Sequence, residues 1–166
     1  FKVVQFSDIH IGAGWMCHGK DLKALNAVAA MVTEEKPDLV IVTGDIAYPI
    51  PPQAGTSDNL TEAKLFATLM ENLGVYWTVT FGNHDTEAYS KYDRAQIAEF
   101  YENSGFKYCL FKSGPDDIDG YGNNVINIKN SKGEITQSIF TFDSHAYLNH
   151  DILGFGYNYD NIRESQ

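Results

Sequence analysis

Residues 38–43 read Asp-Leu-Val-Ile-Val-Thr, a short continuous apolar run that ends at Gly44. Such a run, without alternation, is typical of a strand buried on both faces of a parallel sheet. Parallel neighbours require long crossover connections, which are usually helical. We therefore expect residues 38–43 to be one strand of a βαβ arrangement.

Two similar units flank this run. Residues 2–7 are β-prone, and the apolar residues that follow recur at helical spacing until Pro37, which ends the helix. A second helix is predicted from Asn59, where Glu62 three residues later gives a capping-box-like start, to Gly74. Residues 75–81 form a third strand-like run. The pattern predicts three successive βα units of an α/β protein.

The period changes in the second half of the chain. Asp93 with Gln96 is expected to cap a further helix that ends near Gly105. Residues 124–129 and 135–142 are strand-like, and the Asn-Ser-Lys-Gly segment between them has turn chemistry. We expect a β-hairpin there. The length of 166 residues, with 43% hydrophobic and 20% charged residues, indicates one compact domain or part of one.

Polar motifs follow each of the three predicted strands. Asp8 and His10 stand two residues apart, so the strand period would place both side chains on one side. Gly44-Asp45 follows the second strand and Gly82-Asn83-His84-Asp85 the third, at the edge where open α/β sheets bind ligands. Taken singly, each motif is also compatible with a surface pair or an ordinary turn.

In their order and spacing, Asp8-Ile9-His10, Gly44-Asp45 and Gly82-Asn83-His84-Asp85 resemble the motifs of the calcineurin-like metallophosphoesterase superfamily. Residues 156–166 are similar to a segment of its purple acid phosphatase-like branch. The resemblance implies a four-layer αββα sandwich, two mixed sheets with helices outside. The family takes further histidine ligands, two of them in a Gly-His-x-His motif, from its C-terminal half, and this chain has no Gly-His dipeptide. We expect residues 1–166 to be the N-terminal portion of a single domain whose C-terminal half is absent from this chain, leaving the second sheet incomplete.

The resemblance also implies a set of metal ligands. Asp8 and His10 would hold a first metal ion, Asp45 would bridge two ions, and Asn83 would bind the second through its side-chain oxygen. Two ions held in this way can activate a bridging hydroxide and bind phosphoryl oxygens. Mixed oxygen and imidazole ligands suit divalent or trivalent manganese, iron or zinc.

Two further residues receive catalytic roles from the resemblance. His84 would donate a proton to the leaving group, since imidazole titrates near neutral pH. Asp85 would either orient the His84 imidazole or cap the following segment. The implied function is a metal-dependent hydrolase of phosphate esters, a phosphomonoesterase or phosphodiesterase acting on a small exposed substrate. The alternatives are a non-catalytic binding or scaffold module with the same fold, and a nuclease.

Charge and hydropathy limit the partners. The net charge of −10, with no local cluster of Lys and Arg, makes nucleic acid a poor partner and disfavours the nuclease. No apolar run approaches the roughly 18 residues that span a bilayer, so we expect no membrane span and a soluble segment. The start at Phe1, without Met, is compatible with export after loss of a signal segment. Nothing in the sequence indicates an oligomeric state.

The remaining histidines and cysteines carry weaker expectations. His145, in Asp143-Ser144-His145, is a conceivable substitute ligand, but we expect a loop residue. His18 and His150 are expected to be solvated loop residues. Only two cysteines, Cys17 and Cys109, are present, which excludes a dense disulfide framework and leaves a single bridge open.

Overall fold

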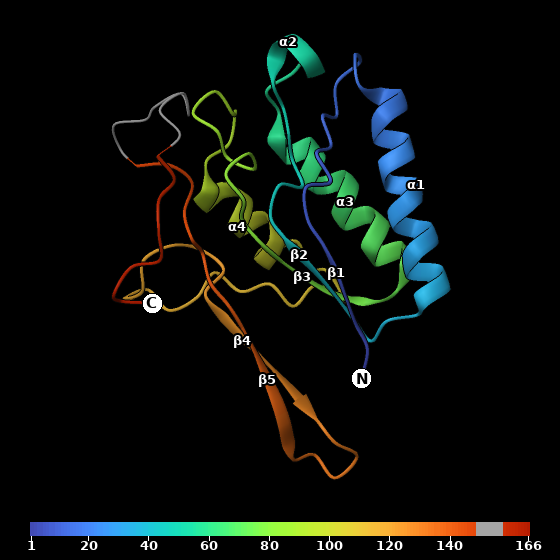
Figure 1. Ribbon diagram of the computed structural model, residues 1–166, viewed down its shortest axis with the longest axis vertical. Coiled ribbons are helices and arrows are strands. Elements are labelled where there is room, and N and C mark those ends of the chain that lie inside the picture. The colour runs from blue at the N-terminus through green and yellow to red at the C-terminus, as the bar shows by residue number, and fades with distance from the viewer. Residues whose placement is uncertain (149–157) are drawn as a thin grey trace.

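The computed structural model of the chain describes residues 1–148 and 158–166 (Figure 1). Its helices and strands in chain order are β1 (Val3–Phe6), α1 (His18–Glu35), β2 (Leu39–Thr43), α2 (Pro51–Ala54), α3 (Asn59–Leu73), β3 (Tyr76–Thr80), α4 (Arg94–Asn103), β4 (Asn124–Lys129) and β5 (Ile135–Thr141). Within the described helices, none is both long and apolar enough to cross a membrane.

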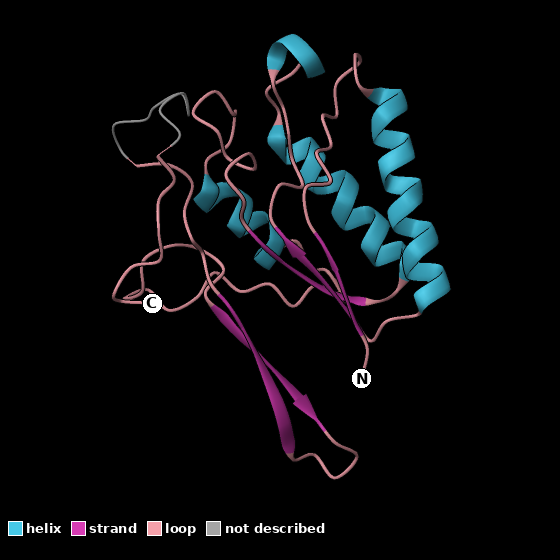
Figure 2. Cartoon of the chain, viewed as in Figure 1, coloured by secondary structure: helices cyan, strands magenta, loops and turns pink. Residues whose placement is uncertain are grey.

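The first three strands form a parallel sheet in the order β1-β2-β3 (Figure 2). Val4 pairs with Val40, and Val42 pairs with Val79. Helices α1 and α3 provide the crossovers and pack against each other. Because all three strands run in the same direction, their carboxyl ends lie along one edge of the sheet. The three predicted βα units are confirmed.

The core lies between this sheet and its helices. Val40, Val42, Trp77 and Val79 are almost completely buried, in keeping with the apolar run that predicted β2. The helices α1, α3 and α4 contribute apolar side chains to the same cluster, among them Val28, Val32, Phe66, Met70, Ile97 and Tyr101. The ring of Trp77 meets those of Phe66 and Tyr101 nearly edge-on, each with 5.8 Å between centroids.

Two predicted helix starts have different outcomes. The capping box of Asp93 and Gln96 at the start of α4 is confirmed, with both reciprocal hydrogen bonds present. For α3, the predicted cap by Asn59 and Glu62 is wrong, because Asp58 is the N-cap and accepts the backbone N–H of Thr61. The Asn59 side chain instead donates to the carbonyls of Asp85 and Tyr92. Glu62 is fully buried, and neither carboxyl oxygen has a hydrogen-bond partner.

The second half of the chain contains the predicted hairpin. Strands β4 and β5 pair antiparallel and project away from the parallel sheet (Figure 1). The Pro-rich segment between β2 and α3 includes one short helix, α2, which begins with Pro51 at a position where the missing N–H is not needed. The α/β class is confirmed: the described residues form a parallel and an antiparallel sheet, in agreement with a metallophosphoesterase fold.

Candidate metal centre

The segments that leave β1 and β2 continue side by side beyond the strands. The N–H of Asp8 donates to the Gly44 carbonyl at 3.2 Å, and the N–H of His10 donates to the Asp45 carbonyl at 3.0 Å. Asp8, His10 and Asp45 all have positive φ angles, of 55°, 53° and 55°. Left-handed conformations are uncommon outside glycine and occur at functional sites that the surrounding structure holds in place.

These backbone angles correct one prediction. Asp8 and His10 were expected on one face of the first strand, but β1 ends at Phe6 and both residues lie beyond it. Their shared left-handed conformation, rather than the strand period, determines their placement. The His10 Nε2 atom still lies 3.8 Å from Asp8 Oδ1, and the side chain of Asp8 is 64% exposed. Asp8 therefore stands at the outer edge of the group.

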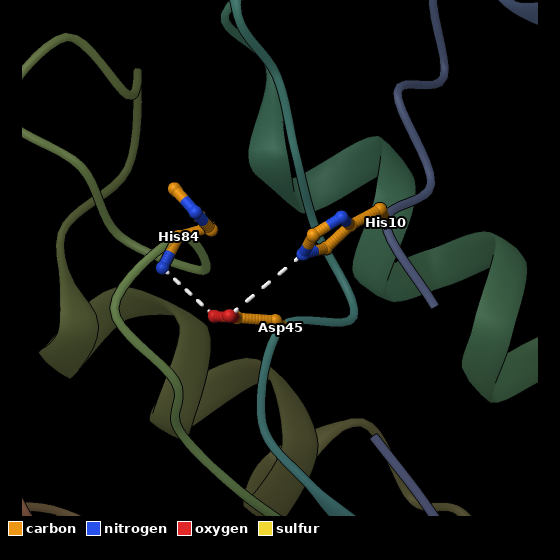
Figure 3. A group of neighbouring side chains, drawn as sticks. All are labelled: His10, Asp45 and His84. Carbon is orange, nitrogen blue, oxygen red and sulfur yellow. Dashed lines mark hydrogen bonds and ion pairs between the residues drawn. The ribbon is translucent and has the colours of Figure 1, made fainter. Parts of the chain in front are cut away.

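His10, Asp45 and His84 come together from the ends of all three parallel strands (Figure 3). One ligand atom from each lies within 4.8 Å of the others, and the Asp45 carboxylate contacts both the His10 ring and the backbone N–H of His84. Burial alone would raise the pKa of Asp45, but the nearby His10 side chain and the His84 backbone N–H outweigh it and lower the pKa. The Asp45 carboxylate and the His10 imidazole are donors that fit a transition metal ion, and the His84 ring lies beside them.

A glycine makes room for the Asp45 carboxylate. A Cβ atom added at Gly82 would lie 2.1 Å from Asp45 Oδ1, well inside contact distance. Two residues after Gly82, the backbone N–H of His84 donates a hydrogen bond to the same Asp45 oxygen at 2.9 Å. The glycine of the third motif is therefore required for close approach between the ends of β2 and β3.

Asp85 connects the segments that follow β2 and β3 through hydrogen bonds. Its buried carboxylate accepts backbone N–H groups from Asp45 at 2.9 Å, Ala47 at 2.9 Å and Gly82 at 2.7 Å. Burial raises the pKa of Asp85, although these hydrogen bonds act in the opposite direction. Of the two roles left open for Asp85, orientation of the His84 imidazole is wrong, because this carboxylate accepts hydrogen bonds from backbone N–H groups.

The His84 imidazole forms a hydrogen bond with Glu87. Glu87 Oε1 lies 2.7 Å from His84 Nδ1, and the Glu87 side chain is nearly buried, at 8% exposure for the residue. This hydrogen bond raises the pKa of His84, against the opposing effect of burial. Sequence reasoning missed Glu87 because it lies beyond the recognisable motif; its only local signal is the i to i+3 spacing.

Asn83 faces a residue from the far end of the chain. Its Nδ2 donates to the Tyr147 hydroxyl at 2.7 Å, and that hydroxyl donates to Glu87 Oε1 at 3.2 Å. Burial raises the pKa of Tyr147 to about 12, so the phenol keeps its proton at neutral pH. Tyr147 was not predicted, since 64 residues separate it from Asn83.

Tyr48 completes the inner surface of the site. Its ring stacks on His10 with 4.7 Å between centroids and an interplanar angle of 17°. It also meets His84 edge-on at 4.6 Å. This tyrosine, three residues after Asp45, was also missed, because an aromatic residue in a Pro-rich loop has no distinguishing pattern.

Two other histidines that the structure describes, His18 and His145, lie outside this group. His145 is a loop residue, with its Nε2 3.8 Å from Asp119 Oδ2. His18 is exposed but is the first residue of α1, which corrects the predicted loop position. His150, and the start of the segment similar to purple acid phosphatases, lie outside the described residues. Cys17 and Cys109 are free thiols.

Comparison with protein families settles the class to which this geometry belongs. A family model described as calcineurin-like phosphoesterase matches residues 1–164. The chain belongs to this family. Its motifs and its relatives place it near the purple acid phosphatase-like branch.

Several curated proteins are similar over the whole of this chain. "Probable inactive purple acid phosphatase 14" of Arabidopsis thaliana is 28% identical, and the match covers 44% of that protein. "Phosphatase DCR2" of Saccharomyces cerevisiae is 29% identical, with 30% of its length covered. "Probable inactive purple acid phosphatase 28" of Arabidopsis thaliana is 26% identical, with 46% covered. The chain thus spans less than half the length of these relatives.

Proposed function

We propose that the whole protein is a metal-dependent hydrolase of phosphate esters, a phosphomonoesterase or phosphodiesterase acting on a small substrate. The observation that carries this proposal is the meeting of His10, Asp45 and His84 at the ends of three parallel strands. The family is one of phosphoesterases, and one relative has the name phosphatase. The geometry of the site and the family of the chain therefore both support the proposed function.

His10 and Asp45 would hold a metal ion, with Asp8 at the outer edge and Asn83 beside a second ion that Asp45 shares. Manganese, iron and zinc suit this combination of imidazole, carboxylate and amide oxygen. When bound, a metal pair supplies an activated water and neutralises charge on the phosphoryl oxygens. We also propose that residues 1–166 are the N-terminal portion of one domain, and that its other half provides the remaining ligands.

His84 is proposed as the general acid. With Nδ1 held by Glu87, the ring keeps Nε2 for a proton that the leaving oxygen needs as its bond to phosphorus breaks. The raised pKa of His84 increases the protonated fraction near neutral pH. Such an acid matters most for alkyl esters, because an alkoxide is a poor leaving group without a proton.

A second function is a binding module without turnover. Two of the similar proteins have names that include "probable inactive". The half-buried, hydrogen-bonded placement of His84 favours catalysis instead, since a module that only binds its ligand has no need for an oriented acid.

The test compares Asp45→Ala and His84→Ala with the unchanged whole protein. Metal content is measured by elemental analysis, and turnover is measured with 4-nitrophenyl phosphate and with an alkyl phosphate. Asp45→Ala is expected to lose both metal and turnover. His84→Ala is expected to retain metal and to lose far more activity on the alkyl ester than on the nitrophenyl ester. Metal-free, inactive whole protein would favour the binding module, and equal metal loss in both variants would remove the acid role from His84.

A further inference from the structure

Four side chains beside the candidate metal centre form one hydrogen-bonded chain. The amide nitrogen of Asn83 donates to the Tyr147 hydroxyl, which donates to Glu87 Oε1, and the same oxygen meets His84 Nδ1. These hydrogen bonds connect Asn83, a proposed metal ligand, to His84, the proposed acid. The two residues between them, Tyr147 and Glu87, have neither role. One of them, Tyr147, comes from the segment after β5.

The Glu87 carboxylate, which lies between Tyr147 and His84, fixes the direction of these hydrogen bonds. An ionised carboxylate only accepts hydrogen bonds, so both Tyr147 and His84 Nδ1 must donate to Glu87. With its proton committed to Glu87, the Tyr147 oxygen can only accept from Asn83, and an amide donates through its nitrogen. If the Asn83 amide were rotated so that Oδ1 faced Tyr147, the hydroxyl would have to donate its proton to Oδ1. Glu87 would then lose the hydrogen bond from Tyr147.

The direction fixes which atoms remain available. On Asn83 the free atom is Oδ1, and an amide oxygen binds metal ions whereas the amide nitrogen does not. On His84 the free ring nitrogen is Nε2, because the partner of one imidazole nitrogen determines the state of the other. Glu87 is nearly buried, so water competes little for its oxygen.

We propose that Tyr147 and Glu87 are positioning residues, with Tyr147 selecting the amide orientation of Asn83 and Glu87 selecting the ring nitrogen that His84 presents. The role of Tyr147 rests on the proposed metal-dependent function. Removal of such a partner from a ligand typically weakens metal binding by about 10–100-fold.

The first experiment measures Mn²⁺ binding to the metal-depleted whole protein by titration calorimetry. Tyr147→Phe removes only the hydroxyl, and about tenfold weaker Mn²⁺ binding is expected. Tyr159→Phe is the matched control, since its ring stacks on that of Tyr147 with 5.7 Å between centroids but the residue is 61% exposed. Unchanged Mn²⁺ affinity in Tyr147→Phe would overturn the role of Tyr147, as would an equal loss in the control.

The second experiment observes the His84 ring by ¹⁵N NMR in metal-free protein, where no turnover is required. The unchanged protein is expected to have the proton on Nδ1 when the ring is neutral. Glu87→Leu, which has a similar shape and no acceptor, is expected to move that proton to Nε2. If this variant does not fold, Glu87→Gln replaces the carboxylate at constant shape and should reduce the Nδ1–H fraction. The same protonated nitrogen in both proteins would overturn the role of Glu87.

The two measurements separate the inference from the function on which it rests. A whole protein that binds none of Mn²⁺, Fe²⁺ and Zn²⁺ would refute the metal-dependent function and the role of Tyr147 together. The ring measurement would still decide the role of Glu87. Conversely, metal binding and turnover with an unaltered His84 ring in Glu87→Leu would leave the function intact and overturn this part of the inference.

Discussion

The carboxylate of Asp85 accepts the backbone N–H of Asp45 at 2.9 Å, so a residue that follows β3 holds in place a residue that follows β2. The same carboxylate also accepts the N–H groups of Ala47 and Gly82. Its function is therefore the alignment of two strand ends, and the left-handed conformation of Asp45 is held by it.

Asp85→Asn should destabilise the protein by about 1–3 kcal/mol, because an amide NH₂ would face at least one buried backbone N–H. Urea unfolding gives the measurement. Asp93→Asn is the matched control, since Asn caps a helix as well as Asp does and α4 should keep its start. Equal stability of the two variants would contradict the alignment role.

Gly82→Ala should reduce metal binding by the whole protein, because the new Cβ would collide with Asp45 Oδ1. Metal content after dialysis against Mn²⁺ checks this. Gly19→Ala serves as the control: it lies in α1 with open space around it, and the substitution should raise stability by roughly 0.5–1 kcal/mol. Full metal content in Gly82→Ala would show that the carboxylate can move without loss.

Glu62 should make stability depend on pH. Burial, together with the nearby charges of Asp85 and Asp21, raises its pKa to about 9. Between its ordinary pKa and about 9, the folded chain keeps a proton that the unfolded chain has lost, so stability falls as pH rises. The slope is about 1.4 kcal/mol per pH unit.

Glu62→Gln should abolish that part of the slope and stabilise the protein above neutral pH. Urea unfolding at about pH 6 and about pH 8 measures the slope in each protein. Glu34→Gln changes an exposed residue of α1 and should leave it unaltered. A Glu62→Gln protein with the same pH slope as the unchanged protein would show that Glu62 is ionised when folded.

Arg94 should be more important for stability than any surface lysine. It forms an ion pair with the fully buried Asp143 and donates to the Gly82 carbonyl at 2.9 Å. Arg94→Leu leaves the Asp143 carboxylate buried without its cation, at an expected cost of about 3–5 kcal/mol. The exposed pair of Lys112 with Glu102 provides the comparison: Lys112→Leu should cost less than about 1 kcal/mol in the same unfolding experiment. Similar losses of unfolding free energy in Arg94→Leu and Lys112→Leu would show that burial of the Asp143 carboxylate does not decide the cost.

Much of the fold was predictable because its signals are local. The apolar run of β2, the helical spacing up to Pro37 and the capping box at Asp93 each depend on a few neighbouring residues. The α3 cap was mispredicted because Asn59 and Asp58 are equally good caps in sequence. Tertiary contacts of Asn59 with Asp85 and Tyr92 decide between them.

The candidate site was predictable only in outline. The sheet topology brings His10, Asp45 and His84 to one edge, as their positions after three strands indicated. Side-chain directions in the loops were not predictable, because left-handed angles at Asp8 and His10 replace the strand period. The same limit explains why Asp85 was expected at the imidazole of His84 while Glu87 is found there.

The assembly of the site from the ends of three parallel strands also affects the order of folding. Each strand pair closes over a helical crossover, so contacts within the site are distant in sequence and form slowly. In the unfolded chain, His10, Asp45 and His84 are not neighbours, so the site does not exist there. At the proposed site a metal ion would bind strongly only after β1, β2 and β3 have paired, so metal binding would be a late step that stabilises a sheet already formed.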